Sequence, residues 1–136
     1  MTGAPSDNML VDWDMLSAAR VELGGNFVRI LGYFREDGEK SVAAIEAAMR
    51  SGNAAAMVIP AHTLKGESAQ FGAEALSNAA EAIETIARDC VENHDGPEQA
   101  LELVVGLRDL FLRTLALLER ETSPLVERRP VFGRRA

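Results

Sequence analysis

Apolar side chains recur every three or four residues along most of the chain, and Gly, Pro, Asn and Ser interrupt this pattern at intervals. This spacing puts the apolar residues of each segment on one face of an α-helix. No segment of useful length alternates apolar and polar residues as a strand would, and no internal repeat is present. The pattern therefore predicts an all-α fold whose helices each bury one face.

The interrupting residues divide the chain into one short helix and four long ones. The short helix is expected over residues 13–22, with Asp12 as its N-cap and Gly24-Gly25 as its end. The long helices are expected over residues 26–50, 53–72, 73–92 and 97–121, the first two capped by Asn26 and Asn53. Short loops between long amphipathic helices predict an antiparallel four-helix bundle, with the short helix covering one end.

The same reading divides the 136 residues into a single bundle domain and two terminal segments. We expect the bundle over residues 12–121, a flexible N-terminus over 1–11 and a basic tail over 122–136. Two residues inside the expected helices disfavour regular helix. Gly38 is predicted to kink or break the first long helix, and Pro60 is predicted to bend the second.

Charge is distributed unevenly along the chain. All 21 acidic residues lie within the first 127 residues with only ten basic ones, a net charge of −11, whereas four arginines lie beyond them. An acidic domain disfavours nucleic acid as a partner. Arg128, Arg129, Arg134 and Arg135 make the tail basic, and we expect this tail to be flexible, with folding back or partner contact as alternatives.

Several other sites and locations are disfavoured by the sequence. Cys90 is the single cysteine, so no intrachain disulfide or thiolate metal cluster is possible. Neither the Glu-x-x-His pairs of carboxylate-bridged metal bundles nor a Cys-x-x-Cys-His haem motif occurs. We expect no cofactor, no signal peptide and no membrane span, hence a cytoplasmic protein without membrane partners.

His62 lies on the second long helix, on the face opposite the apolar one. Steps of about 100° per residue place five residues on the core side, namely Met57, Ala61, Leu64, Ser68 and Phe71. The residues around His62 are small or apolar except Lys65, and they are Ala55, Val58, Ile59, Gly66 and Ala69. Because Gly66 weakens the helix and the surrounding surface is apolar, we predict that another protein docks there.

Glu84 is predicted to reach His62 across the next helical turn. The two residues lie eleven positions on either side of Ala73, near the centre of the expected hairpin, so they share a level in an antiparallel pair. A carboxylate at one ring nitrogen fixes the tautomer and raises the basicity of the other nitrogen.

The stretch Ala61-His62-Thr63-Leu64-Lys65-Gly66, with Ser68, Gly72, Leu76 and Ile83-Glu84 after it, resembles the histidine-containing phosphotransfer (HPt) family. The resemblance extends over roughly residues 12–120, and Pro60 departs from the family pattern. It implies a helical bundle that carries a phosphoryl group on the Nε2 atom of one histidine.

The resemblance also implies roles for individual residues and partners. His62 would be the phosphoacceptor, Lys65 would stabilise the phosphoryl charge, Gly66 would leave room for the partner, and Glu84 would bond the histidine. The partners would be response-regulator receiver domains and a sensor histidine kinase or hybrid kinase, and magnesium would belong to the receiver. No nucleotide-binding loop is present, so the chain would be a phosphorelay carrier and not an enzyme. The main alternative is a helical adaptor that binds receivers without phosphotransfer.

Overall fold

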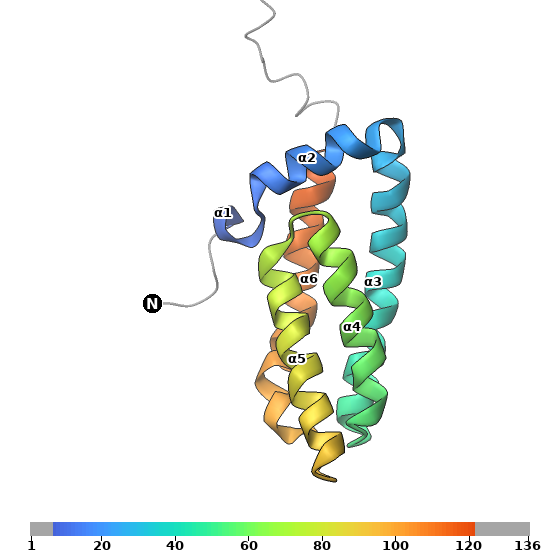
Figure 1. Cartoon of the computed structure of the whole chain (residues 1–136), viewed down its shortest axis with the longest axis vertical. Helices are drawn as coiled ribbons and strands as arrows, with labels where there is room; N and C mark the ends of the chain where they lie inside the picture. Colours follow the sequence, from blue (N-terminus) through green and yellow to red (C-terminus); the bar gives the residue numbers. More distant parts are fainter. Residues whose placement is uncertain (1–6, 122–136) are drawn as a thin grey trace, which may run out of the picture.

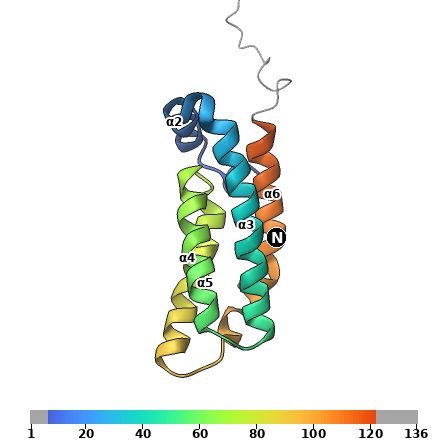
Figure 2. The same ribbon diagram turned by 90° about the vertical axis from the view of Figure 1, so that its right-hand side faces the viewer.

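The computed structural model describes residues 7–121, with side chains from Met9 onward, and all regular elements in that range are helices. Four long antiparallel helices form the bundle, namely α3 (Phe27–Arg50), α4 (Ala55–Gln70), α5 (Glu74–Glu92) and α6 (Leu101–Arg120). Figures 1 and 2 show the hairpin of α4 and α5 packed beside α3 and α6. The predicted all-α bundle is therefore confirmed.

The additional short helix is α2 (Trp13–Leu23), which crosses the end of the bundle above the turn between α4 and α5 (Figure 1). Asp12 caps it as predicted, because its Oδ1 accepts from the Met15 amide at 3.1 Å. The Asp12 amide in turn donates to the Gly72 carbonyl at 2.7 Å. Gly72 has a φ of 72°, and a Cβ there would lie 2.8 Å from the Asp12 carbonyl oxygen, so glycine permits this close docking.

The N-terminal segment differs from the expectation of flexibility over residues 1–11. Residues Asp7–Leu10 form one helical turn, α1, which contacts α5 and α6. Leu10 and Val11 are buried in the core, so hydrophobic burial orders this part of the segment. Residues 1–6 and the basic tail lie outside the described residues.

Asn26 does not cap α3, which corrects a second expectation. Its backbone is helical and its side chain makes no capping hydrogen bond. Gly24, with a φ of 54°, ends α2, and a 3₁₀ turn over Gly24–Asn26 leads directly into α3. The Phe27 amide bonds the Gly24 carbonyl, so the turn itself supplies a partner at the helix start. Asn53 does cap α4, since its Oδ1 accepts from the Ala56 amide at 3.1 Å.

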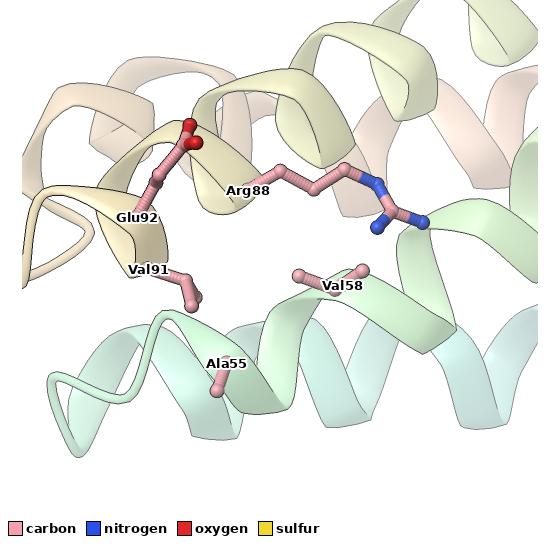
Figure 3. Close-up of a pocket in the computed structure, with 5 residues that line it drawn as sticks. All are labelled: Ala55, Val58, Arg88, Val91 and Glu92. Carbon is pink, nitrogen blue, oxygen red and sulfur yellow. The ribbon is translucent and has the colours of Figure 1, made fainter.

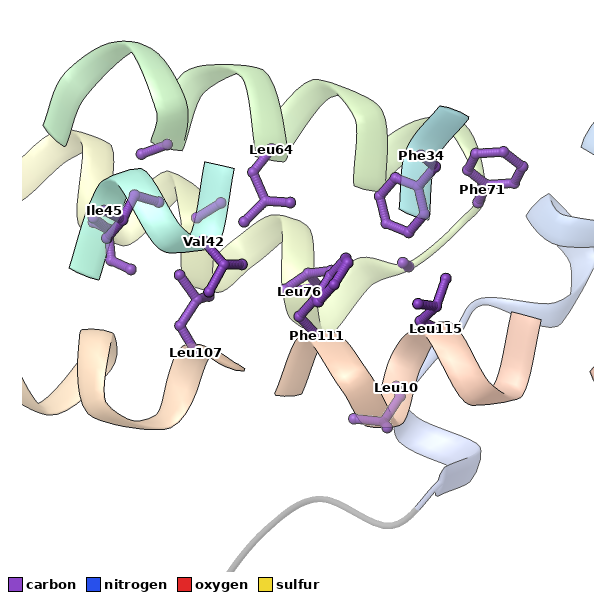
Figure 4. Close-up of a cluster of buried hydrophobic side chains, with 14 of the residues drawn as sticks. Leu10, Phe34, Val42, Ile45, Leu64, Phe71, Leu76, Leu107, Phe111 and Leu115 are labelled. Atoms are coloured by element: carbon purple, nitrogen blue, oxygen red, sulfur yellow. The ribbon is translucent and has the colours of Figure 1, made fainter. Parts of the chain in front are cut away.

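Neither Gly38 nor Pro60 interrupts its helix. Gly38 faces the core, where a Cβ would lie 2.8 Å from Cζ of Phe111. The Phe111 ring packs against Phe34, whose ring lies 5.4 Å from that of Phe71, and these three rings join α3, α6 and the end of α4 (Figure 4). Gly38 therefore gives room for this aromatic contact between α3 and α6.

A 3₁₀ turn over Glu98–Ala100 precedes α6, and Pro97 lies just before it. Pro97 therefore starts this turn and not the α-helix itself. Among the helices of residues 7–121, none has both the length and the apolar character required to cross a bilayer.

Candidate functional site

His62 lies midway along α4 and points away from the core, with 61% of its side chain exposed. The predicted core stripe on the opposite side is buried at every position, namely Met57, Ala61, Leu64, Ser68 and Phe71. The helical-face prediction is therefore confirmed, and Pro60 does not disturb it.

Glu84 of α5 lies beneath His62 and is almost entirely buried, with 5% exposure. Its Oε2 atom is 3.0 Å from Nδ1 of His62. The same oxygen accepts from Nε and Nη2 of Arg88 at 3.0 and 2.9 Å, while Oε1 lies 3.0 Å from Nζ of Lys65 in an ion pair. One buried carboxylate thus joins three basic side chains from two helices.

This arrangement keeps Glu84 ionised. Burial raises the pKa of its carboxyl group, but hydrogen bonds and charge from Lys65, Arg88 and His62 outweigh burial and lower the pKa from 4.5 to about 2. An ionised carboxylate only accepts hydrogen bonds, so Nδ1 of His62 carries the proton. In the uncharged imidazole the lone pair then lies on Nε2, the nitrogen not bonded to Glu84.

The helical hairpin sets the level of these groups. The turn at Gly72 brings α4 and α5 together along their length, as Figure 1 shows. Ser77 of α5 donates from Oγ to the Lys65 carbonyl at 3.0 Å, which links the two helices near the site. His62 and Glu84 meet at the level that their equal separation from the turn predicts.

The surface around His62 is small and apolar. Ala55, Ile59, Gly66 and Ala69 are exposed and Val58 is half-buried, with Ile59 exposed to 74%. A Cβ at Gly66 would meet no atom within 4 Å, so packing within residues 7–121 does not require glycine there. The exposed glycine therefore leaves open surface next to the imidazole.

A shallow hollow of about 410 Å³ continues this surface toward the N-terminal end of α4. Figure 3 shows Ala55 and Val58 of α4 facing Val91 and Arg88 of α5, with Glu92 at the edge. Arg88 thus borders the hollow and also bonds Glu84.

The structure brings His62, Lys65 and Glu84 together as the sequence predicts. It places the Lys65 ammonium on Glu84, a contact that the sequence reasoning did not anticipate. Arg88 was missed, although its position four residues after Glu84 on one helix is a recognisable ion-pair spacing.

Two other candidate groups lie apart from this site. His94 is in an exposed loop with a φ of 61°, and Cys90 is buried on α5, where burial raises the pKa of its thiol. Within residues 7–121 no three His, Cys, Asp or Glu side chains are grouped as metal ligands.

Comparisons with known proteins identify the family. The sequence model of the Hpt domain matches residues 29–121. The structure of histidine-containing phosphotransfer protein B (HptB) from Pseudomonas aeruginosa PAO1 superposes with a TM-score of 0.73 at 24% identity, covering 83% of this chain and 94% of that one. That likeness shows a shared fold, while no curated protein sequence matches the chain. The match over residues 29–121 shows that this chain belongs to the Hpt domain family, whose members transfer phosphoryl groups in two-component phosphorelays.

Proposed function

We propose that His62 is the phosphoacceptor, taking a phosphoryl group from a kinase or a receiver aspartate and passing it to a response-regulator receiver aspartate. One observation carries this assignment: an exposed imidazole whose Nδ1 is bonded to a buried, ionised carboxylate. Such a carboxylate leaves Nε2 as a nucleophile directed away from Glu84.

The Glu84 carboxylate has an electrostatic role in this reaction. The Nε2 lone pair attacks phosphorus, the N–P bond forms, and the O–P bond of the aspartyl phosphate breaks to release the aspartate carboxylate. The ring then carries a positive charge, because Nδ1 keeps its proton while Nε2 is bonded to phosphorus. Glu84 stabilises that charge across 3.0 Å, and the cationic ring is also a good leaving group for the return transfer.

The docking face supports a protein as the phosphoryl donor and acceptor. Five residues form this face around His62: Ala55, Val58, Ile59, Gly66 and Ala69. Exposed apolar surface beside a nucleophile favours association with a partner, and the missing side chain at Gly66 allows the partner's backbone to approach. We assign the magnesium of the reaction to the receiver domain, and we infer a carrier without catalytic turnover of its own.

Replacement of the histidine tests the acceptor assignment. Each receiver domain encoded in the source genome would be phosphorylated with labelled acetyl phosphate and Mg²⁺ and then mixed with the chain. We expect acid-labile label on the wild type, none on His62→Gln, and full label on His94→Asn, in which Asn tolerates the positive φ of that loop. An unlabelled wild type, or equal labelling of His62→Gln, would refute the proposal.

Receiver binding and signalling of the His62→Gln variant distinguish the relay from the adaptor alternative. A relay predicts that His62→Gln binds the receiver as the wild type does, measured by calorimetry, while phosphotransfer and signalling are lost. An adaptor predicts that signalling survives the same substitution.

Substitution of Gly66 by Gln tests the docking face. Gln fits the helix sterically and has a higher helix propensity by roughly 0.5–1 kcal/mol, so Gly66→Gln should raise the free energy of unfolding. It should also weaken receiver affinity by roughly tenfold, because the added side chain occupies the surface on which the receiver docks. Unchanged affinity would show that the receiver docks elsewhere.

A further inference from the structure

The two oxygens of Glu84 are unequally shared among the basic groups. Oε2 accepts hydrogen bonds from Nδ1 of His62 and from two donors of Arg88, whereas Oε1 is paired with the Lys65 ammonium. Oε1 is itself fully buried, and the Lys65 ammonium 3.0 Å away is the group that compensates its charge.

Phosphorylation of His62 would create a competitor for Lys65. A phosphoryl group on Nε2 brings negative charge onto the helix face that Lys65 shares with His62, one turn away. An ammonium carries one charge, and its departure from Glu84 would leave the buried Oε1 atom without a partner, while Arg88 remains on Oε2. Lys65 therefore serves the phosphoryl group fully only when another donor takes over Oε1.

Arg88 has the donor that this exchange requires. Its Nε and Nη2 both bond one oxygen, although the planar guanidinium fork is suited to one donor on each carboxylate oxygen. A small rotation of the exposed Arg88 head would move Nη2 from Oε2 to Oε1. Resting on the acceptor role of His62, we infer that Arg88 is a positioning residue that takes over Glu84 and frees Lys65 to neutralise the phosphoryl group.

A double-mutant cycle on Lys65 and Arg88 tests this exchange. Phosphoramidate would serve as donor, since its P–N bond breaks, ammonia leaves and the bond from Nε2 to phosphorus forms without any docking partner. In the wild-type background Lys65→Gln should slow phosphorylation by roughly tenfold, the range for one charged hydrogen bond. Arg88→Gln should slow it to a similar degree, because Lys65 then remains on Glu84.

The decisive measurement is the effect of Lys65→Gln in the Arg88→Gln background. We expect less than about a twofold further loss, since Lys65 no longer reaches the phosphoryl group. Arg88→Lys should resemble Arg88→Gln, because an ammonium keeps the charge but lacks the fork. Arg113→Gln is the matched control, as it removes an arginine from an i,i+4 ion pair on α6, and its rate should equal that of the wild type.

Ring ¹⁵N shifts of His62 separate this role from simple support of the site. The Nδ1–H tautomer should persist in Arg88→Gln, showing that Glu84 still holds the ring. Two kinetic results would overturn the exchange: additive effects of Lys65→Gln and Arg88→Gln, or a wild-type rate in Arg88→Gln or Arg88→Lys. Loss of the Nδ1–H tautomer in Arg88→Gln would also overturn it. Equal labelling of His62→Gln would instead refute the acceptor assignment, so the two failures are distinguishable.

Discussion

At the scale of single residues, the site depends on one buried carboxylate. Glu84 is nearly inaccessible and still ionised, because three basic groups surround it. A buried ion pair is costly to desolvate and is weak evidence for stability by itself. Here the same contacts fix the imidazole tautomer, so the chemistry of His62 gives a reason for burying the charge.

The pH dependence of stability tests the ionisation of Glu84. A lowered folded-state pKa means that the stabilisation is fully present above about 4.5 and is lost as pH falls toward about 2. The shift corresponds to about 3 kcal/mol at neutral pH. Urea unfolding of the wild type and Glu84→Gln should therefore differ by about that amount at pH 7 and converge near pH 2.

Glu81→Gln is the matched control for this titration, since Glu81 is exposed on the same helix. Its difference from the wild type should stay within about 0.5 kcal/mol across the range. A Glu84→Gln difference that is the same at pH 6 and pH 2 would contradict an ionised Glu84 in the folded protein.

At the scale of helices, two glycines of α3 should respond to alanine in opposite ways. Alanine gains roughly 1 kcal/mol over glycine in helix propensity. At Gly38 the added Cβ would collide with the buried Phe111 ring, which costs about 1–3 kcal/mol, so the net effect of Gly38→Ala should be destabilising. Gly32 has no atom within 4 Å of its Cβ position, so Gly32→Ala should raise the unfolding free energy by up to about 1 kcal/mol.

Chemical denaturation of the two variants measures both effects. If Gly38→Ala were as stable as Gly32→Ala, the close approach of α3 to Phe111 would not exist in solution.

Helices were predictable from the sequence where local patterns decide the structure. The period of apolar residues located α2 to α6, and Asp12 and Asn53 cap their helices as their side chains suggest. Asn26 has the same capping chemistry but does not cap, because the preceding 3₁₀ turn already supplies a backbone partner. The local sequence alone predicts that Gly38 breaks the helix. Only the position of Phe111 on another helix explains why a glycine stands there.

The candidate site, like the helices, was only partly predictable from the sequence. The exposure of His62 and the level of Glu84 follow from helical geometry and the position of the turn. The number of cations on Glu84, and therefore its pKa, depends on side-chain conformations that no spacing specifies. Arg88 was missed for this reason, although its spacing from Glu84 was visible.

At the scale of the whole molecule, the bundle provides a rigid support that leaves one face open. Arg108 of α6 bonds both Glu39 and Glu46 of α3 at 2.9–3.1 Å, which links the helices away from the site. The hairpin of α4 and α5 carries His62 and Glu84, and its turn is held by the Asp12 amide. Order at the N-terminal end is thus coupled to the hairpin that bears the site.

Substitution of Leu10 by Ala tests the coupling between the N-terminal end and the hairpin of α4 and α5. It is fully buried at the contact of α1 with α5 and α6, so Leu10→Ala should lower the unfolding free energy by about 2 kcal/mol or more. Met9 is the matched control because it is adjacent and 69% exposed, and Met9→Ala should change stability by less than about 0.5 kcal/mol. Denaturation measures both, and amide hydrogen exchange should show faster exchange at the Asp12 amide in Leu10→Ala alone. Equal stability of the two variants would mean that residues 7–11 do not pack on the bundle and that the turn at Gly72 is held without them.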